Sequence, residues 1–161
     1  MDTTTALRVQ PLKYPLSARA LDKWARSDLS CAADANGGRH YQFRFLGSTC
    51  TDGGSAFHAN FHVVLSPSPQ GAVIEAAWID LPLDDGNPGA AQMCVFQTQR
   101  DLFLAELSRP PAFCGGTLEA AIERQVELDY AGCLCFDQML NHKWRNVLCT
   151  IHYALASEQR T

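Results

Sequence analysis

Two segments of alternating hydrophobic and polar residues, with a third strand-like segment soon after them, constrain the fold of this chain most strongly. Residues 40–45 and 56–65 alternate with the period of two that is typical of a half-buried β-strand. The predicted inner side has Tyr41, Phe43 and Phe45 in the first segment and Phe57, Ala59, Phe61, Val63 and Leu65 in the second. Residues 72–81 follow the stretch SPSPQG, which has the composition of a turn. Because short links join the three segments, the sequence predicts a three-stranded antiparallel meander.

Hydrophobic residues at helical spacing occur on both sides of the predicted strands. Before them, residues 17–27 form a helix candidate with Ser17 at the N-cap and Leu21 and Trp24 on one face, and residues 28–38 are expected to form a loop. After them, the expected helices span residues 89–107, 117–126 and 141–156. Thr117 is a candidate cap of the second of these helices, and the last has one hydrophobic stripe: Trp144, Leu148, Ile151 and Leu155. This order predicts an α+β fold: one helix, a three-stranded antiparallel sheet, and about three further helices packed on one face.

The composition is that of one compact domain. With 161 residues, of which 47% are hydrophobic and 19% charged, we expect a single domain over residues 1–161 with a flexible N-terminal segment, 1–13. Thirteen Lys and Arg residues are spread thinly in a chain of net charge −4, which argues against nucleic-acid binding. The sequence has neither a signal-peptide pattern nor the roughly 20 apolar residues of a membrane span, so we expect a cytoplasmic protein.

A cysteine and an aspartate in one turn form the main candidate site. Cys50 and Asp52 stand two residues apart in a glycine-rich stretch between two predicted strands. Thiolates and carboxylates bind soft or borderline metals when they meet ligands from other elements, and Cys149 in the last predicted helix offers another thiol. Cys133 and Cys135 form a C-x-C pair, which is a weaker metal signature than C-x-x-C. The odd number of cysteines, seven, disfavours a complete disulfide framework.

The histidines are weaker evidence for a metal site than Cys50 and Asp52. His58 and His62 lie on the same side of one predicted strand, where we favour a solvated strand face over a metal site. His142 and His152 make no obvious pair, and we expect both at the surface.

Four short stretches follow the order of elements in a known family. They are SARALDKW (17–24), GSTCTD (47–52), VIEAAW (73–78) and CTIHYA (149–154). In these stretches the chain resembles the U-type iron–sulfur cluster scaffolds, the IscU/NifU/SufU-like family. GSTCTD is similar to the first ligand turn of that family, and Cys149 is similar to the last ligand cysteine, which opens a C-terminal helix. The family has its second cysteine directly after the third strand, whereas here residues 84–91 have none and Cys94 comes later.

The resemblance implies a scaffold that works by coordination rather than turnover. Its cofactor would be a [2Fe-2S] cluster, or zinc in its place, held by Cys50, Asp52 and Cys149 with Cys94 as a fourth ligand. The partners it implies are a cysteine desulfurase that supplies sulfur and a recipient apo-protein.

Two alternatives stay open. One is a metal-free interaction module of the same fold that has lost the cluster site. The other is a thiol-dependent enzyme in which Cys50 is the nucleophile, activated by His58 or His152.

Overall fold

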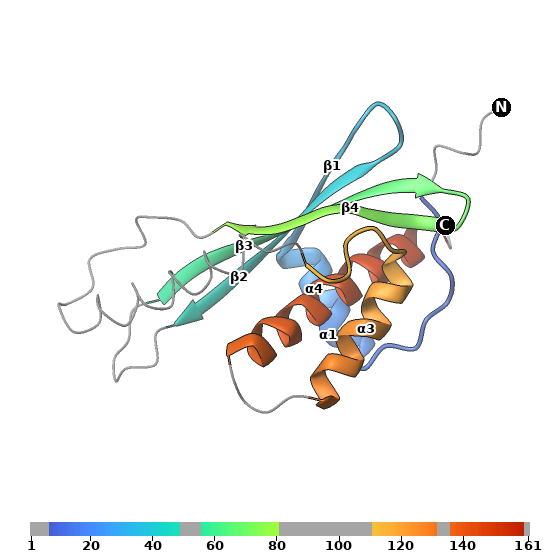
Figure 1. Cartoon of the computed structure of the whole chain (residues 1–161). Helices are drawn as coiled ribbons and strands as arrows, with labels where there is room; N and C mark the ends of the chain where they lie inside the picture. The colour runs from blue at the N-terminus through green and yellow to red at the C-terminus, as the bar shows by residue number, and fades with distance from the viewer. Residues whose placement is uncertain (1–6, 49–55, 81–110, 132–135, 160–161) are drawn as a thin grey trace.

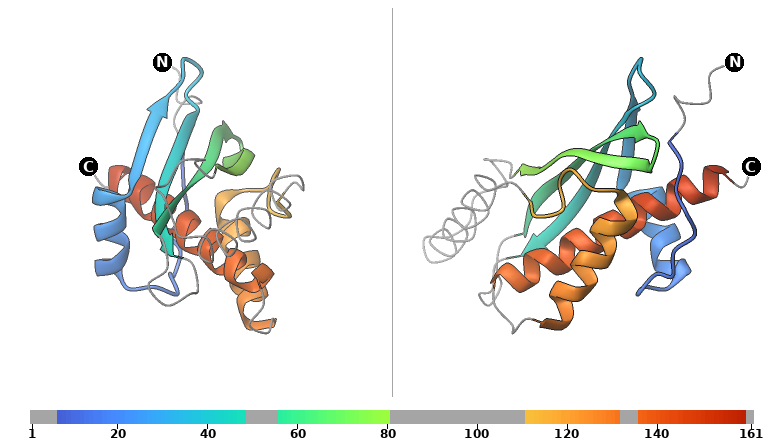
Figure 2. Two further views of the ribbon diagram at one scale, coloured as in Figure 1. Left: turned by 90° about the vertical axis from the view of Figure 1, so that its left-hand side faces the viewer. Right: turned by 45° about the vertical axis from the view of Figure 1, so that its right-hand side comes forward.

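The computed structural model of the chain describes residues 7–48, 56–80, 111–131 and 136–159. They form an α+β fold with one four-stranded antiparallel sheet and three helices on one of its faces (Figures 1 and 2). The elements in chain order are α1 (Ala18–Ser27), β1 (Leu29–Ala33), β2 (Arg39–Ser48), β3 (Ala56–Ser68), β4 (Gly71–Asp80), α3 (Leu118–Ala131) and α4 (Phe136–Gln159). The strands lie side by side in sequence order, so the sheet is a meander.

The sheet has one strand more than we predicted. Strands β2, β3 and β4 correspond to the three predicted strands. Strand β1 lies within residues 28–38, for which a loop was expected, and that expectation was wrong. Its sequence, LSCAA, is exposed after Leu29 and lacks a strong strand pattern. Its pairing with β2, from Leu29↔Phe43 to Ala33↔Arg39, therefore sets its conformation more than its own propensity does.

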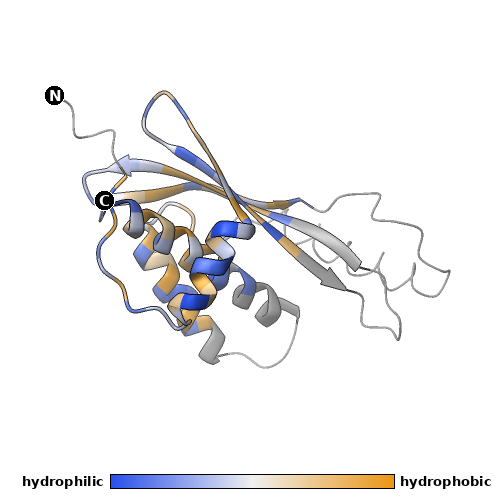
Figure 3. Ribbon diagram, turned by 180° about the vertical axis from the view of Figure 1, so that it is seen from behind, coloured by the Kyte–Doolittle hydropathy of each residue, from blue (hydrophilic) through white to orange (hydrophobic). Residues whose placement is uncertain are grey.

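Predicted caps begin two of the helices. The side-chain oxygen of Ser17 accepts a hydrogen bond from the N–H of Ala20 at 3.2 Å, and Thr117 does the same for Ala120 at the start of α3. Helix α1 is amphipathic, with Leu21 buried and hydrophilic residues on its outer side (Figure 3). The predicted stripe of α4 is buried: Trp144, Leu148, Ile151 and Leu155. The helix expected over residues 89–107 lies outside the described residues.

The core lies between the inner face of the sheet and the helices. Phe61 on β3 is almost fully buried there, and its ring meets the ring of Trp144 on α4 edge to face, with 4.9 Å between centroids. The inward positions of the predicted strands supply the rest of the sheet's contribution: Tyr41, Phe43, Val63, Leu65, Ile74 and Ile79. Among the described helices, none combines the length and the apolar character that crossing a membrane requires.

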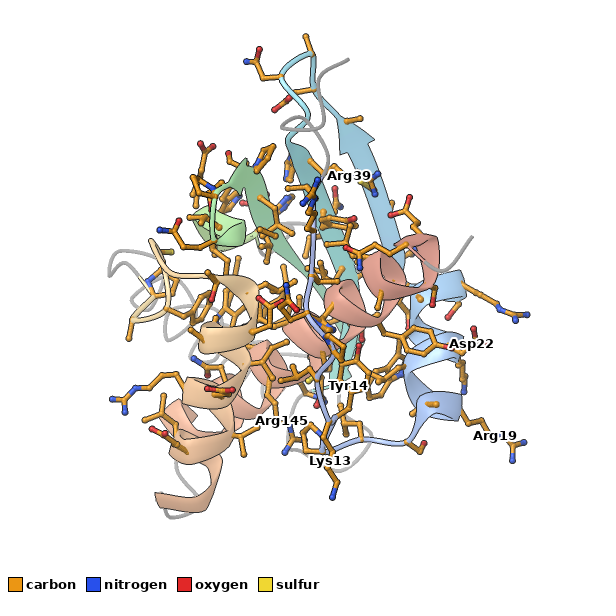
Figure 4. The ribbon with its side chains drawn as sticks, turned by 90° about the vertical axis from the view of Figure 1, so that its right-hand side faces the viewer. Lys13, Tyr14, Arg19, Asp22, Arg39 and Arg145 are labelled. Carbon is orange, nitrogen blue, oxygen red and sulfur yellow. The ribbon has the colours of Figure 1, made fainter. Side chains whose placement is uncertain are left out.

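Helix α4 runs antiparallel to β2 along this inner face. Arg39, at the start of β2 (Figure 4), pairs with Glu158 near the end of α4. At the other end of the contact, Nζ of Lys143 lies 4.3 Å from the centre of the Phe45 ring. The N-terminal part of α4 is therefore next to the later half of β2.

Residues 7–16 form a segment that we call the N-terminal strap. Its first part belongs to the segment for which we expected flexibility, but Leu7 and Val9 are buried. The N–H of Val9 donates to Oε1 of Gln159 at 2.7 Å, and the carbonyl of Arg8 accepts from the N–H of Ala72 at 3.1 Å. The strap thus connects β4 with the end of α4.

Candidate functional site

A cleft of about 420 Å³ opens between the end of α1, the sheet and α4. We call it the aromatic cleft. It is lined by four aromatic residues together with charged, polar and aliphatic ones: Trp24, Ser27, Asp28, Phe43, Arg44, Phe45, Phe61, Lys143, Asn146 and Val147. Its volume falls in the range of about 300–1,000 Å³ that is usual for small-molecule sites.

The cleft is located next to the start of β1. Helix α1 ends with the N–H of Asp28 donating to the carbonyl of Trp24 at 2.9 Å. The carbonyl of Asp28 accepts from the N–H of Arg44 at 2.9 Å, which ties this turn to β2. Strand β1 begins only at Leu29, opposite Phe43, so it does not extend along the later half of β2. The rings of β2 and β3 can therefore line an open space between α1 and α4.

Lys143 is the distinctive polar group of the aromatic cleft. Burial lowers the pKa of its ammonium below the ordinary lysine value. The π face of Phe45 lies beside the charge at 4.3 Å and favours the protonated form, in the opposite direction. No carboxylate among the described residues lies within ion-pair distance of its Nζ atom. The cleft thus holds a half-buried cation whose described partner is an aromatic ring.

Charges of opposite sign lie on the two helical walls. Asp28 follows the C-terminal end of α1, which carries partial negative charge, and Lys143 lies on α4. Arg44 on β2 also borders the cleft, but it lies between the inward-facing Phe43 and Phe45, at a position of the outer face of the sheet. The two helical walls therefore contribute one cation, Lys143, and one carboxylate, with flat apolar surfaces between them.

The structure describes one of the four predicted metal ligands. Cys50, Asp52 and Cys94 lie outside the described residues, as does the Cys133–Cys135 pair. Cys149 lies well inside α4 instead of at the start of a helix, and it is fully buried in the hydrophobic core. In the part of the chain that the structure describes, no three His, Cys, Asp or Glu side chains are grouped so that they could hold a metal ion.

Two of the expected surface histidines are buried. His152 on α4 is fully buried, with Nδ1 2.6 Å from the hydroxyl of Tyr14 and Nε2 2.9 Å from the carbonyl oxygen of Gln10. His62 is on the outer face of the sheet, as predicted, but it is only 7% exposed. Burial lowers its pKa below the ordinary histidine value, although the carboxylate of Asp80 acts in the opposite direction. The expectation of a solvated strand face was therefore wrong at His62. His58 and His142 lie on β3 and α4, and their side chains are not described.

Comparison with known proteins finds no relative of this chain. No family model matches it, and neither the curated proteins nor the solved structures give a significant match. The resemblance to the U-type scaffolds therefore rests on the four stretches alone.

Lys143 was not expected from the sequence to be a functional residue. It directly precedes Trp144 of the buried stripe, and Asn146 and Val147 follow within one turn, so all three lie near the boundary of the buried face. The aromatic residues were correctly assigned to the inner face, but a period-two pattern does not show where a helix leaves that face open. No signal within a single predicted element indicates the cleft, because four elements form it.

Proposed function

We propose that this protein binds a small molecule with a flat, aromatic or apolar body and an anionic group, and that the aromatic cleft is its site. The observation that carries the proposal is the Lys143 ammonium, which lies over the Phe45 ring in the cleft without a described carboxylate partner. Folding has already removed part of the water around this ammonium, and no ion pair with a described residue replaces it. An anion that binds there therefore needs to displace less water from the ammonium, which makes the contact favourable.

The other lining groups fit the same class of ligand. Phe43, Phe45 and Phe61 offer ring surfaces that contact a flat apolar body. The amide of Asn146 can donate to an anionic oxygen or accept from a ligand hydroxyl. Asp28, on the opposite wall, suits a ligand whose far end carries a hydrogen-bond donor.

The iron–sulfur or zinc scaffold stays a prediction, and the geometry of α4 gives it no support. Cys149 is six residues beyond Lys143 in α4, about 9 Å along the helix. Ser48, the last residue of β2, is three residues beyond Phe45 in the other direction, about 10 Å along the strand. Because α4 and β2 are antiparallel, Cys149 and the end of β2 that leads to Cys50 lie about 19 Å apart along the sheet.

The test uses two probes of the same shape and different charge. Binding of 2-naphthoate and of the uncharged 2-naphthamide to the full chain is measured by isothermal titration calorimetry. We expect naphthoate to bind at least tenfold more tightly than naphthamide. In Lys143→Met, which keeps the length of the side chain and removes its charge, this preference should disappear. Lys23→Met, at an exposed position of α1 outside the cleft, should retain it.

Three results would contradict the proposal. They are the absence of binding by either probe at millimolar concentration, equal binding of the two probes by the unmodified chain, and an unchanged preference for naphthoate in Lys143→Met. Circular dichroism of each variant shows whether a loss of binding reflects a loss of folding.

A further inference from the structure

The outer face of the sheet has an unexpected buried group. All three described helices lie on the other face (Figures 1 and 2). His62 is nevertheless 7% exposed, and its ring stacks on that of Trp78, its register partner on β4, at 4.7 Å and an interplanar angle of 5°. The ring of His40 on β2 lies 5.1 Å from that of His62 and 5.2 Å from that of Trp78. We call His40, His62, Trp78 and Asp80 the histidine cluster.

The two imidazoles face each other through nitrogen atoms. Nε2 of His40 is 2.9 Å from Nδ1 of His62. At that separation a neutral pair shares one hydrogen, because two N–H groups would repel each other. The other nitrogen of His62, Nε2, is 2.9 Å from Oδ2 of Asp80, off the direction of a hydrogen bond but within ion-pair distance. A carboxylate there favours hydrogen on Nε2 and leaves the Nδ1 lone pair directed at His40.

The separation of the two nitrogens matches that of two imidazoles bound to one metal ion. Two nitrogens bound to one ion at about 2.0–2.1 Å, with angles between about 90° and 109°, are about 2.8–3.4 Å apart. The His40–His62 separation is within that range. A ligating histidine commonly has a carboxylate at its other ring nitrogen, which sets the tautomer and strengthens the donor, and Asp80 has this position at His62.

The strands hold the two donors firmly. His40 and His62 are on the adjacent central strands β2 and β3. Gln42 is the register partner of His62, and His40 is two residues before Gln42, so the two histidines are diagonal neighbours on the same face of the sheet. The stacked indole of Trp78 fixes the plane of the His62 ring. Exchange of the shared hydrogen for a metal ion requires the two rings to tilt until both lone pairs point at the ion, and water can complete the coordination on the side of the half-buried His40.

We propose that His40 Nε2 and His62 Nδ1 bind a divalent transition-metal ion of the kind that prefers imidazole, such as Zn²⁺, Ni²⁺ or Cu²⁺. Asp80 is a positioning residue behind His62, not a ligand. The site is separate from the aromatic cleft, since the two are on opposite faces of the sheet, and it uses none of the cysteines considered above.

The experiment observes the ring nitrogens directly, because the seven cysteines of the chain also bind metals. The full chain is labelled with ¹⁵N-histidine, accessible thiols are alkylated with iodoacetamide, and ZnSO₄ is added while long-range ¹H–¹⁵N spectra are recorded. We expect saturable shifts of His40 Nε2 and His62 Nδ1. His40→Gln should abolish the His62 shift or weaken zinc binding at least tenfold, and His142→Gln should leave both shifts unchanged.

A second variant separates binding from folding. Asp80 is 59% exposed, so Asp80→Asn should fold normally and should weaken zinc binding several-fold through the loss of the charge behind His62. Shifts confined to other histidines, no shift of His40 and His62 in excess zinc, or full binding in His40→Gln would each overturn the proposal.

Discussion

The hydroxyl of Tyr14 lies 2.6 Å from Nδ1 of His152, although 138 residues separate the two in the chain. Nε2 of His152 is 2.9 Å from the carbonyl oxygen of Gln10, so this nitrogen carries the hydrogen and Nδ1 accepts from Tyr14. A fully buried histidine thus has both ring nitrogens satisfied by the N-terminal strap. The strap is therefore part of the folded unit rather than an addition to it.

Removing the Tyr14 hydroxyl should leave a buried acceptor on His152 without its donor. We expect Tyr14→Phe to lower the free energy of unfolding by ~1–3 kcal/mol, measured by urea denaturation. Tyr153→Phe is the matched control, because the hydroxyl of Tyr153 makes a longer contact, 3.4 Å, with the partly exposed Asp22. Equal losses in the two variants would show that the Tyr14–His152 contact adds nothing.

The strap should also make stability depend on acidity through Glu119. Its Oε2 accepts from the N–H of Gln10 at 2.6 Å and lies 3.6 Å from Nε2 of His152. Burial raises the pKa of Glu119, but the hydrogen bonds that its carboxylate accepts outweigh this effect, so the pKa lies below the ordinary value. A lowered folded-state pKa stabilises the protein above the unfolded-state value, and the contribution disappears as the pH falls through the folded-state value.

We therefore compare the free energy of unfolding of the unmodified chain with that of Glu119→Gln between about pH 7 and pH 3. The advantage of the unmodified chain should be constant above about pH 5.5 and shrink below about pH 4.5. Glu123→Gln, an exposed position on the same helix, should show no such trend. A difference that does not vary with pH would contradict the assigned role of Glu119.

Two glycines with positive φ allow the cost of a close contact to be separated from the cost of the backbone. Gly71 has φ of 123°, and a Cβ atom there would lie 3.0 Å from the carbonyl oxygen of Arg8 in the strap. Gly115 has φ of 94° with nothing near a Cβ position. Gly115→Ala should cost ~1–2 kcal/mol of stability from the backbone alone. Gly71→Ala should cost more in thermal or urea denaturation, because the strap must also move; an equal or smaller cost would show that the contact with Arg8 is easily relieved.

We expect the charge of Lys143 not to stabilise the unliganded protein. Lys143→Met keeps contact with the Phe45 ring and no longer places an ammonium in a partly dehydrated position, so we expect the unliganded variant to be at least as stable as the unmodified chain. Lys23→Met should change the free energy of unfolding by less than ~0.5 kcal/mol. A loss above ~1 kcal/mol in Lys143→Met would mean that the ring–ammonium contact stabilises the fold by itself.

The sequence predicted those elements in which hydrophobic residues recur at the regular spacing of a strand or a helix. The caps Ser17 and Thr117, the buried stripe of α4 and the inward rings of β2 and β3 were all correctly assigned. Strand β1 was missed because LSCAA is exposed after Leu29, and its conformation depends on pairing with β2. Residues 29–33 alone do not indicate that this segment pairs with β2.

The surroundings of the histidines were less predictable for the same reason. His62 and His152 were expected to be solvated because alternation and helical spacing identify a face but not what lies against it. A diagonal neighbour, His40, and a register partner, Trp78, bury His62, and the strap buries His152. The predicted ligands Cys50, Asp52 and Cys94 lie outside the described residues, so that part of the sequence prediction stays a prediction.

The late start of β1 has a consequence for the opening of the aromatic cleft. Beyond Arg44, no described strand pairs with the free edge of β2, and α1 ends beside that point. Additional residues between Ser27 and Leu29 would allow β1 to pair with more of β2, and the longer β1 would close the opening of the cleft. The length of β1 therefore sets the width of this opening. Insertions or deletions in the turn between α1 and β1 would change which molecules can enter the cleft without changing the residues that line it.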